Sequence, residues 1–254
     1  MSPIAISLIA LASIVGGTLF GMFLRTLLPE HHLSADSKDV MKMGTGTVAT
    51  MAALVLGLLI SSAKGTFDTM NSGLVQTGSK IILLDRVMAN YGPETREARD
   101  ILRRTVATTL KRIWPEEKNA IAIEKFVKGK SGAEDVEEKL RQLSPRNDDQ
   151  RQLQSRALQI IGEIEEARWL VIEQTEQSSL PVPFLVLLIC WLALIFAGFG
   201  LFTSRNTTVI VALFVCALSV ASSLFLILEL NQPYGGLIKV SSAPLFTALA
   251  HLGQ

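Results

Sequence analysis

Charged side chains are absent from the four longest apolar stretches of this chain. These stretches are Ile4–Leu24, Met43–Ala63, Leu180–Ser204 and Asn206–Leu228. About 20 apolar residues cross the hydrocarbon core of a bilayer, so each stretch predicts a transmembrane helix. Ion-coupled transporters and pumps usually carry a carboxylate, histidine or lysine within such a helix, and voltage sensors carry a row of arginines. The absence of both argues against these two classes.

Cysteine is also scarce. Both cysteines, Cys190 and Cys216, lie inside predicted spans. At 1.5 Å per residue along antiparallel helices they differ in depth by roughly 8 Å, which is too far for a disulfide. We expect two unpaired thiols that act as small apolar side chains.

Several chemical signatures are missing as well. The formal net charge is +1, whereas a nucleic-acid partner requires a concentrated basic face. The sequence has no Ser/His/Asp or Cys/His set, phosphate loop or nucleotide fingerprint, so we expect neither enzyme activity nor a cofactor. His31 and His32 are adjacent and have no third ligand nearby, so we expect no metal site.

Charge is concentrated in one segment. Between Lys64 and Leu180 lie 19 of the 24 Lys and Arg residues and 19 of the 23 Asp and Glu residues. A nearly neutral, charge-dense segment between two pairs of spans predicts an extramembrane domain inserted between spans two and three. We therefore divide the chain into a transmembrane hairpin at 1–64 (spans 4–28 and 43–63), a helical domain at 65–180, a second hairpin at 181–228 (spans 183–204 and 207–228) and a tail at 229–254.

The inserted domain reads as helical throughout. Apolar residues at helical spacing follow Pro93 and continue to Pro115, which predicts one helix. A second long helix is predicted after Pro145 from the 4,3,4,3,4 spacing of Leu153, Ala157, Ile160, Ile164, Ala167 and Val171. We expect these two helices to pack on each other. Span two can continue beyond Lys64, although Gly73 and Gly78 weaken that continuation by about 1 kcal/mol each. The predicted fold class is all-α.

Four spans place the N-terminus, the inserted domain and the tail on the same side of the membrane. Lys and Arg near the span ends do not decide which side is the cytoplasm, because each side has four: Arg25, Lys38, Lys42 and Arg205 against Lys64, Lys80, Arg168 and Lys239. No basic segment precedes Ile4, so we expect the first span to be a retained anchor rather than a secretory signal.

Span two carries a face of small and polar residues, spaced 4,3,4,4,3: Gly46, Thr50, Ala53, Gly57, Ser61 and Lys64. Small residues let membrane helices approach closely, so the face can serve helix packing. In a ring of subunits it can instead line a pore, with Lys64 as a charged ring at one mouth. Leu54 and Leu58 lie on a neighbouring face and could form a hydrophobic constriction. Asp68, one turn beyond Lys64, has the opposite charge and leaves the ion preference open.

Span four has a comparable stripe, formed by Ala212, Cys216, Ser219 and Ser223. For this stripe we predict packing against span two or span three.

Two sequence motifs are more specific than the overall composition. One is Leu84-Asp85-Arg86-Val87 followed by Asn90-Tyr91-Gly92-Pro93-Glu94, with Arg96 and Arg99. The other is the tail segment Leu228–Ser242. Together with the arrangement of the spans, they resemble the bestrophin-like family, largely bacterial membrane proteins of unknown function. The wider bestrophin comparison implies a pentameric channel for small inorganic ions in the bacterial inner membrane, with span two lining the pore and both termini and the helical domain in the cytoplasm.

The chain departs from bestrophins in two respects. Bestrophins narrow the pore with bulky apolar residues on span two, where this chain has the small, polar face. Their calcium clasp uses an acidic cluster after span four, where this chain has only Glu229. The resemblance therefore implies conduction but not calcium activation.

The tail suggests a connection between the membrane and the helical domain. Pro233 and Gly235-Gly236 predict a turn, after which Leu237, Ile238 and Val240 can dock on the domain. Glu229 can pair with Arg86 or Lys64, or simply be solvated at the interface. The residues predicted to couple the two parts are Arg86, Glu229, Asn231, Pro233 and Tyr234.

Two functions follow from these patterns. The first is a homo-oligomeric ion channel. The second is a membrane-anchored interaction or signalling protein without transport activity, for which the charge-dense domain is the binding element.

Overall fold

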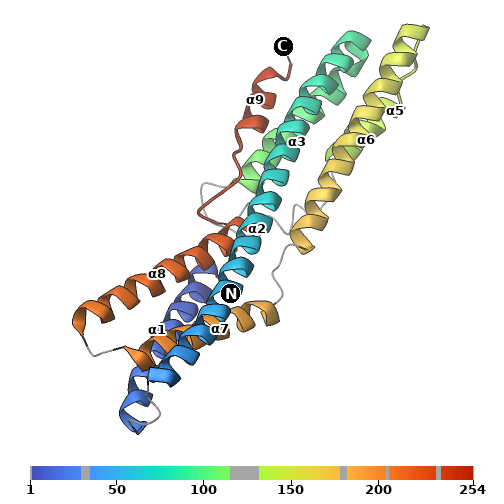
Figure 1. The fold of residues 1–254 in the computed structure, drawn as a ribbon. Helices are drawn as coiled ribbons and strands as arrows, with labels where there is room; N and C mark the ends of the chain where they lie inside the picture. Colours follow the sequence, from blue (N-terminus) through green and yellow to red (C-terminus); the bar gives the residue numbers. More distant parts are fainter. Residues whose placement is uncertain are drawn as a thin grey trace. The chain divides into compact units, whose positions relative to one another are not determined.

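The computed structural model describes residues 2–29, 35–114, 132–177, 182–203, 206–232 and 236–253. Every regular element in these ranges is helical (Figure 1). The elements are α1 (Pro3–Leu27), α2 (Ala35–Tyr91), the 3-10 turn η2 (Pro93–Thr95), α3 (Arg96–Ile113), α5 (Gly132–Arg141), α6 (Asp148–Gln177), α7 (Val182–Phe202), α8 (Thr207–Leu230) and α9 (Ala243–His251). Four of them, α1, α2, α7 and α8, are long and apolar enough to cross a membrane. The predicted all-α fold with four apolar helices is confirmed.

Some predictions concern residues outside the described ranges. These residues are His31, His32, Pro115, Pro233, Tyr234 and Gly235.

Local sequence signals account for where the membrane helices begin. The side chain of Ser2 accepts a hydrogen bond from the backbone of Ala5 at 3.3 Å, and Pro3 occupies the first turn of α1. At α8 the cap is Asn206, whose side chain accepts from the backbone of Thr208 at 3.2 Å. Both caps satisfy amide groups that the first helical turn leaves unpaired.

The chain divides into two compact units, and α2 contributes to both. The first unit is Met1–Thr66 with Ser179–Asn231, and the second is Phe67–Ser178 with Gln232–Gln254. In the first unit, α1 packs on α7 and α8. Its core contains the buried residues Ala10, Ile14, Ala52, Leu188, Leu192, Ile195, Phe196, Ala217 and Leu224.

Glycines bring α1 and α7 together. A Cβ at Gly17 would lie 2.5 Å from the carbonyl oxygen of Ala193, and a Cβ at Gly21 would collide with the carbonyl of Ala197. One turn beyond Gly21, the Arg25 guanidinium donates a hydrogen bond to the backbone carbonyl of Thr203. Because the contacts advance in the same direction along both helices, α1 and α7 run parallel. This is the direction that a four-span chain requires of its first and third spans.

The stripe predicted on span four does not make the expected contacts. Ala212, Cys216 and Ser219 are exposed in this chain and Ser223 is half-buried. The buried face of α8 instead contains Ala217, Ala221, Leu224, Ile227, Leu228, Glu229 and Leu230. Within this chain the predicted packing of the stripe is therefore not observed, and α8 packs on α1.

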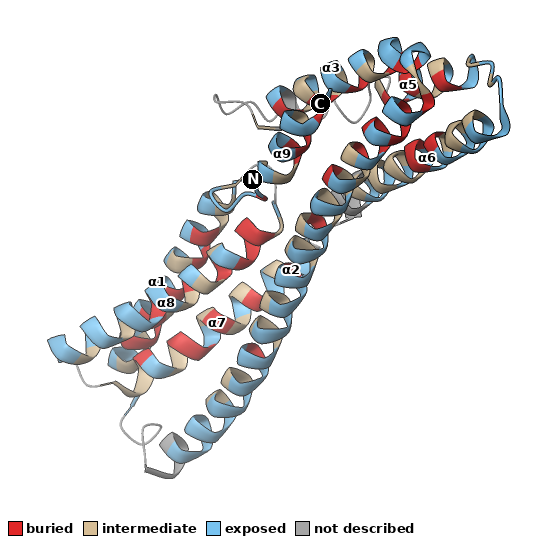
Figure 2. Cartoon of the chain, turned by 90° about the horizontal axis from the view of Figure 1, so that it is seen from above, coloured by how far each residue is buried: buried red, intermediate tan, exposed pale blue. Residues whose placement is uncertain are grey.

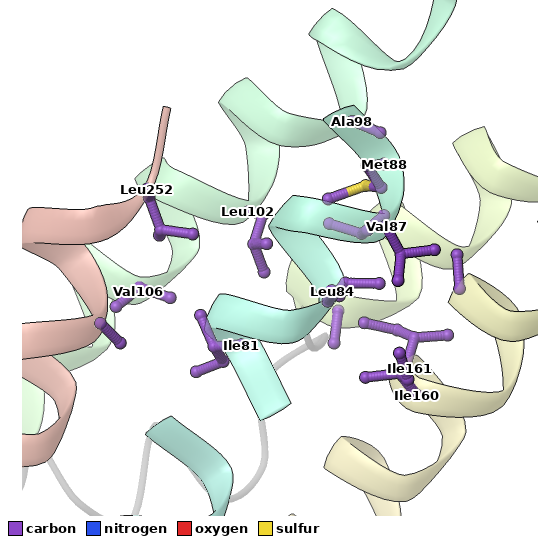
Figure 3. Packing of buried hydrophobic residues seen from close by; sticks show 14 of the residues in the cluster. Ile81, Leu84, Val87, Met88, Ala98, Leu102, Val106, Ile160, Ile161 and Leu252 are labelled. Atoms are coloured by element: carbon purple, nitrogen blue, oxygen red, sulfur yellow. The ribbon is translucent and has the colours of Figure 1, made fainter. Parts of the chain in front are cut away.

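The core of the second unit combines more elements than the two predicted helices. Figure 3 shows Leu84 and Met88 of α2 in one cluster with Leu102 of α3 and Ile160 of α6. α5 contributes Ala133, Val136 and Leu140, and α9 with the residue after it contributes Leu245, Ala248 and Leu252. We predicted that α3 and α6 pack on each other and that the tail docks on this domain, but we predicted neither α5 nor α9.

α2 continues without a break from the apolar segment to Tyr91, as predicted. It ends because Gly92 adopts a φ of 134°, a conformation that side chains other than glycine rarely reach. The hydroxyl of Thr95 donates to the carbonyls of Met88 at 2.6 Å and Gly92 at 2.8 Å, which holds the turn into α3. The α-helix therefore begins at Arg96, three residues after the predicted start at Pro93.

Candidate functional site

The small, polar face of α2 is uncovered. All six of its residues are exposed in this chain: Gly46, Thr50, Ala53, Gly57, Ser61 and Lys64. The neighbouring Leu54 and Leu58 are also exposed, at 65% and 71% of their surface. Figure 2 shows the ribbon of α2 largely pale blue along this part, unlike the red patches on α7 and α8. Packing against other helices of the same chain, one of the two interpretations of this face, therefore does not occur.

The opposite face of α2 makes the contacts within the chain. Ala52 and Ala63 are each only 2% exposed, and Val48, Ala49, Val55, Leu56 and Leu59 pack against the core of the unit. The small residues of α1 and α2 therefore differ in what they contact. Gly17 and Gly21 of α1 touch the backbone of α7, whereas a Cβ at Gly46 or Gly57 of α2 would have nothing within 4 Å.

The uncovered face offers polar groups along an otherwise apolar helix. The hydroxyl of Thr50 donates to the carbonyl of Gly46 at 3.0 Å, a bond within the helix that leaves the oxygen lone pairs available to a ligand. Lys64 adds an ammonium group at the C-terminal end of this face. Such a surface can contact water and ions, or it can contact a second copy of the chain.

The predicted coupling residues lie in different units. Arg86 is exposed in the second unit, and Glu229 is buried, at 3% exposure, in the first. Asn231 caps the end of α8, where its amide donates to the carbonyl of Ile227 at 2.9 Å. The pairing of Glu229 with Arg86 or Lys64 stays a prediction.

The second unit contains an ion pair to which the sequence analysis gave no role. Arg99 of α3 donates two hydrogen bonds to the carboxylate of Asp85 on α2, at 2.7 and 2.8 Å. The same carboxylate accepts the backbone N–H of Gly253 at 3.2 Å. Asp85 is 3% exposed, and its hydrogen bonds to the Arg99 guanidinium raise the pKa of Arg99 above its usual value. The pair joins α2, α3 and the segment after α9.

The tail docks on the second unit, but not through all the residues predicted. Val240 is 1% exposed, whereas Leu237 and Ile238 are 71% and 37% exposed. The indole N–H of Trp114 donates to the carbonyl of Val240 at 2.9 Å. The predicted docking is thus correct for Val240, and α9 provides the remaining buried contacts.

Within the described ranges, no group of three or more His, Cys, Asp or Glu residues could hold a metal ion. Cys190 and Cys216 are unpaired, as expected.

Comparison with known proteins gives two matches. The family model described as the bestrophin-like domain matches residues 12–245. The fold is similar to the crystal structure of a mutant bacterial bestrophin homologue from Klebsiella pneumoniae, with a TM-score of 0.59 and 16% sequence identity over 96% of this chain and 97% of that one. No curated protein matches the chain.

Proposed function

Because this chain belongs to the bestrophin-like family, we propose that it is a homo-oligomeric ion channel in which α2 lines the pore. The observation that carries the proposal is the uncovered small, polar face of α2. The four apolar helices make the chain a membrane protein, and side chains that face lipid are normally large and apolar. A face of glycine, alanine and hydroxyl groups is better suited to water or to a second subunit than to lipid.

In a ring of subunits, this side of α2 can contact both water and an adjacent subunit. Around a central axis, Gly46, Thr50, Ala53, Gly57 and Ser61 would face water, and the exposed Leu54 and Leu58 would lie beside the adjacent subunit or form a narrow apolar gate. The fold of the bestrophin homologue supports this arrangement at the level of topology. We favour a pentamer in the bacterial inner membrane, with the second unit and both termini in the cytoplasm.

The decisive experiment is reconstitution of the purified protein in planar bilayers, with Gly57→Leu as the test variant. A leucine at this position has open space within its own chain and improves helix propensity by about 1 kcal/mol, so the subunit should still fold. On a pore axis it would narrow the path in every subunit. We expect discrete conductance from the natural protein and a several-fold smaller unit conductance from the variant.

Gly44→Leu is the matched control. Gly44 is also exposed and also has open space at its Cβ, but it lies about 140° away around the helix. We expect its conductance to equal that of the natural protein. A folded oligomer that gives silent bilayers would overturn the channel proposal and favour the membrane-anchored interaction protein.

The link between the units forms the second part of the proposal. Asn231 ends α8, and Val240 is docked on the second unit, so the segment 232–239 connects the last span to the helical domain. We propose that Glu229 and Asn231 transmit movement between these parts, and that Asn231→Ala changes open probability while leaving unit conductance unchanged.

A further inference from the structure

The tail segment that follows α8 keeps two large apolar side chains on the surface of the second unit. Leu237 is 71% exposed and Ile238 is 37% exposed. Val240, on the same segment, is buried at 1% exposure, and its carbonyl accepts the indole N–H of Trp114 at 2.9 Å. The segment is therefore held in place at Val240, while its two larger apolar side chains remain at the surface.

The surface around this segment is positively charged. Lys239 lies on the segment itself, and Lys111 lies one turn of α3 before Trp114; both lysines are exposed. Neither 101–114 nor 231–254 contains an Asp or Glu residue. The contact between Trp114 and the tail thus joins two segments that carry cations and no acidic side chains, and such a surface attracts anions.

The acidic residues of α3 lie toward its other end. Glu97 forms an ion pair with Lys139 at 2.8 Å, and Asp100 lies about three turns, or roughly 16 Å, before Lys111. The fields of exposed charges fall off over roughly 10 Å in physiological salt. Glu97 and Asp100 therefore do not cancel the positive charge beside the tail segment.

Covalent connection keeps this segment near the end of a membrane helix. α8 has 24 residues and is about 36 Å long, whereas the hydrocarbon core is about 30 Å thick, so Leu230 lies at the level of the lipid headgroups. Two residues lead from Leu230 to Gln232, and the backbone N–H of Gly236 donates to the carbonyl of Gln232 at 3.2 Å. At 3.8 Å between successive Cα atoms, Leu237 can be no more than about 18 Å from Leu230, whatever the arrangement of the two units.

We propose that this tail segment binds anionic phospholipids of the bilayer that the protein spans. Leu237 and Ile238 enter the boundary between headgroups and acyl chains, as the apolar side chains of peripheral membrane segments do. Lys239 and Lys111 attract the headgroup phosphates. The combination of exposed aliphatic side chains with lysines favours a lipid surface over a purely polar anion. The inference requires only that α8 spans the membrane, so it does not depend on channel function.

The test measures the depth of a fluorophore on the tail. The full chain, with Cys190→Ala and Cys216→Ala to remove the two free thiols, carries an NBD label at Leu237→Cys. It is reconstituted in vesicles of phosphatidylcholine alone or of equal parts phosphatidylcholine and phosphatidylglycerol. We expect lipids that are spin-labelled at the headgroup to quench the label strongly in the phosphatidylglycerol vesicles and several-fold less in phosphatidylcholine.

Charge variants test the role of the lysines. Lys239→Gln and Lys111→Gln should each lower the ratio of quenched to unquenched label about fivefold, the contribution of one lysine near an anionic membrane surface. Both side chains are exposed, so neither change should disturb folding. Arg156→Gln is the matched control, since it removes an exposed cation from α6 and should leave the ratio unchanged. A second label at Ser155→Cys, exposed in the first half of α6, should not be quenched.

Several results would overturn the proposal. Equal quenching in the two kinds of vesicle would exclude recognition of anionic headgroups. Blue-shifted emission without quenching by lipid would mean that protein, such as a second copy of the chain, covers Leu237, and red-shifted emission would mean that water does. Equal quenching of the label at Ser155 would refute the assignment to the tail. None of these results depends on conductance, so the channel proposal stands or falls separately.

Discussion

Replacing Asp85 by alanine tests the packing of the second unit most directly. The substitution removes a carboxylate that is 3% exposed and accepts three hydrogen bonds, two from the Arg99 guanidinium and one from the backbone of Gly253. Hydrogen bonds to charged groups contribute about 1.5–3 kcal/mol each in mutational studies, and breaking a fully buried ion pair costs about 3–5 kcal/mol. The side chain of Arg99 is 21% exposed, so water can partly solvate it after the change. We expect a loss of about 3 kcal/mol in the free energy of unfolding.

The assay is urea unfolding in mild detergent, followed by tryptophan emission and helical circular dichroism. Trp114 reports on this unit because its indole donates a hydrogen bond to Val240. Arg151→Ala is the control, since Arg151 pairs with Asp148 at 2.8 Å on the surface, with the two side chains 70% and 87% exposed. Exposed pairs of this kind contribute at most about 1 kcal/mol.

A double-mutant cycle completes the test. We expect Asp85→Ala and Arg99→Ala to show a coupling energy of about 2 kcal/mol, because each change removes the same two hydrogen bonds. A loss below about 0.5 kcal/mol for Asp85→Ala, or additive effects of the two changes, would refute the assignment of this pair as a structural element. The raised pKa of Arg99 keeps its charge in any ordinary buffer. The stabilisation that this shift represents is fully present below the pKa of arginine in the unfolded chain and is lost only as the pH rises through the folded-state value.

Three other changes should give measurable results. Gly21→Leu should lower the thermal unfolding midpoint in detergent by several degrees, because the new side chain meets the backbone of α7; Gly16→Leu, with nothing within 4 Å of its Cβ, should not. Gly92→Ala should destabilise the protein by about 1–2 kcal/mol in urea titrations because of the φ of 134°, whereas Gly73→Ala should stabilise it by up to about 1 kcal/mol. Trp114→Phe should lose about 1 kcal/mol and speed amide hydrogen exchange in α9, and unchanged exchange would show that the bond to Val240 does not hold the tail.

The membrane helices could be predicted because hydrocarbon imposes a strict requirement on length and charge, and the four stretches meet it without exception. The continuation of α2 and the course of α6 follow from helical spacing in the same way. α9 was missed because nine residues give little periodic signal, although Ser242 and Pro244 mark a helix start.

The environment of Asp85 and the close contact of α1 are partly encoded in local residue spacing. Ile81, Asp85 and Met88 share a helical face, so the spacing places the carboxylate of Asp85 on an apolar face. A buried carboxylate predicts a cationic partner. Its identity as Arg99 depends on how α3 folds back, which no local pattern specifies. Gly17 and Gly21 form the G-x-x-x-G spacing of close membrane contacts, but the helix that they meet is set by tertiary packing.

The contact between Asp85 and Gly253 joins residues 168 positions apart, and this separation constrains biosynthesis. Leu245, Ala248 and Leu252 leave the ribosome only after α7 and α8 have been made, so the hydrophobic centre of the second unit stays incomplete while the last two spans enter the bilayer. Insertion must therefore precede maturation of this unit. Until then the core residues of α2, α3, α5 and α6 lack the apolar contacts that α9 supplies in the finished protein.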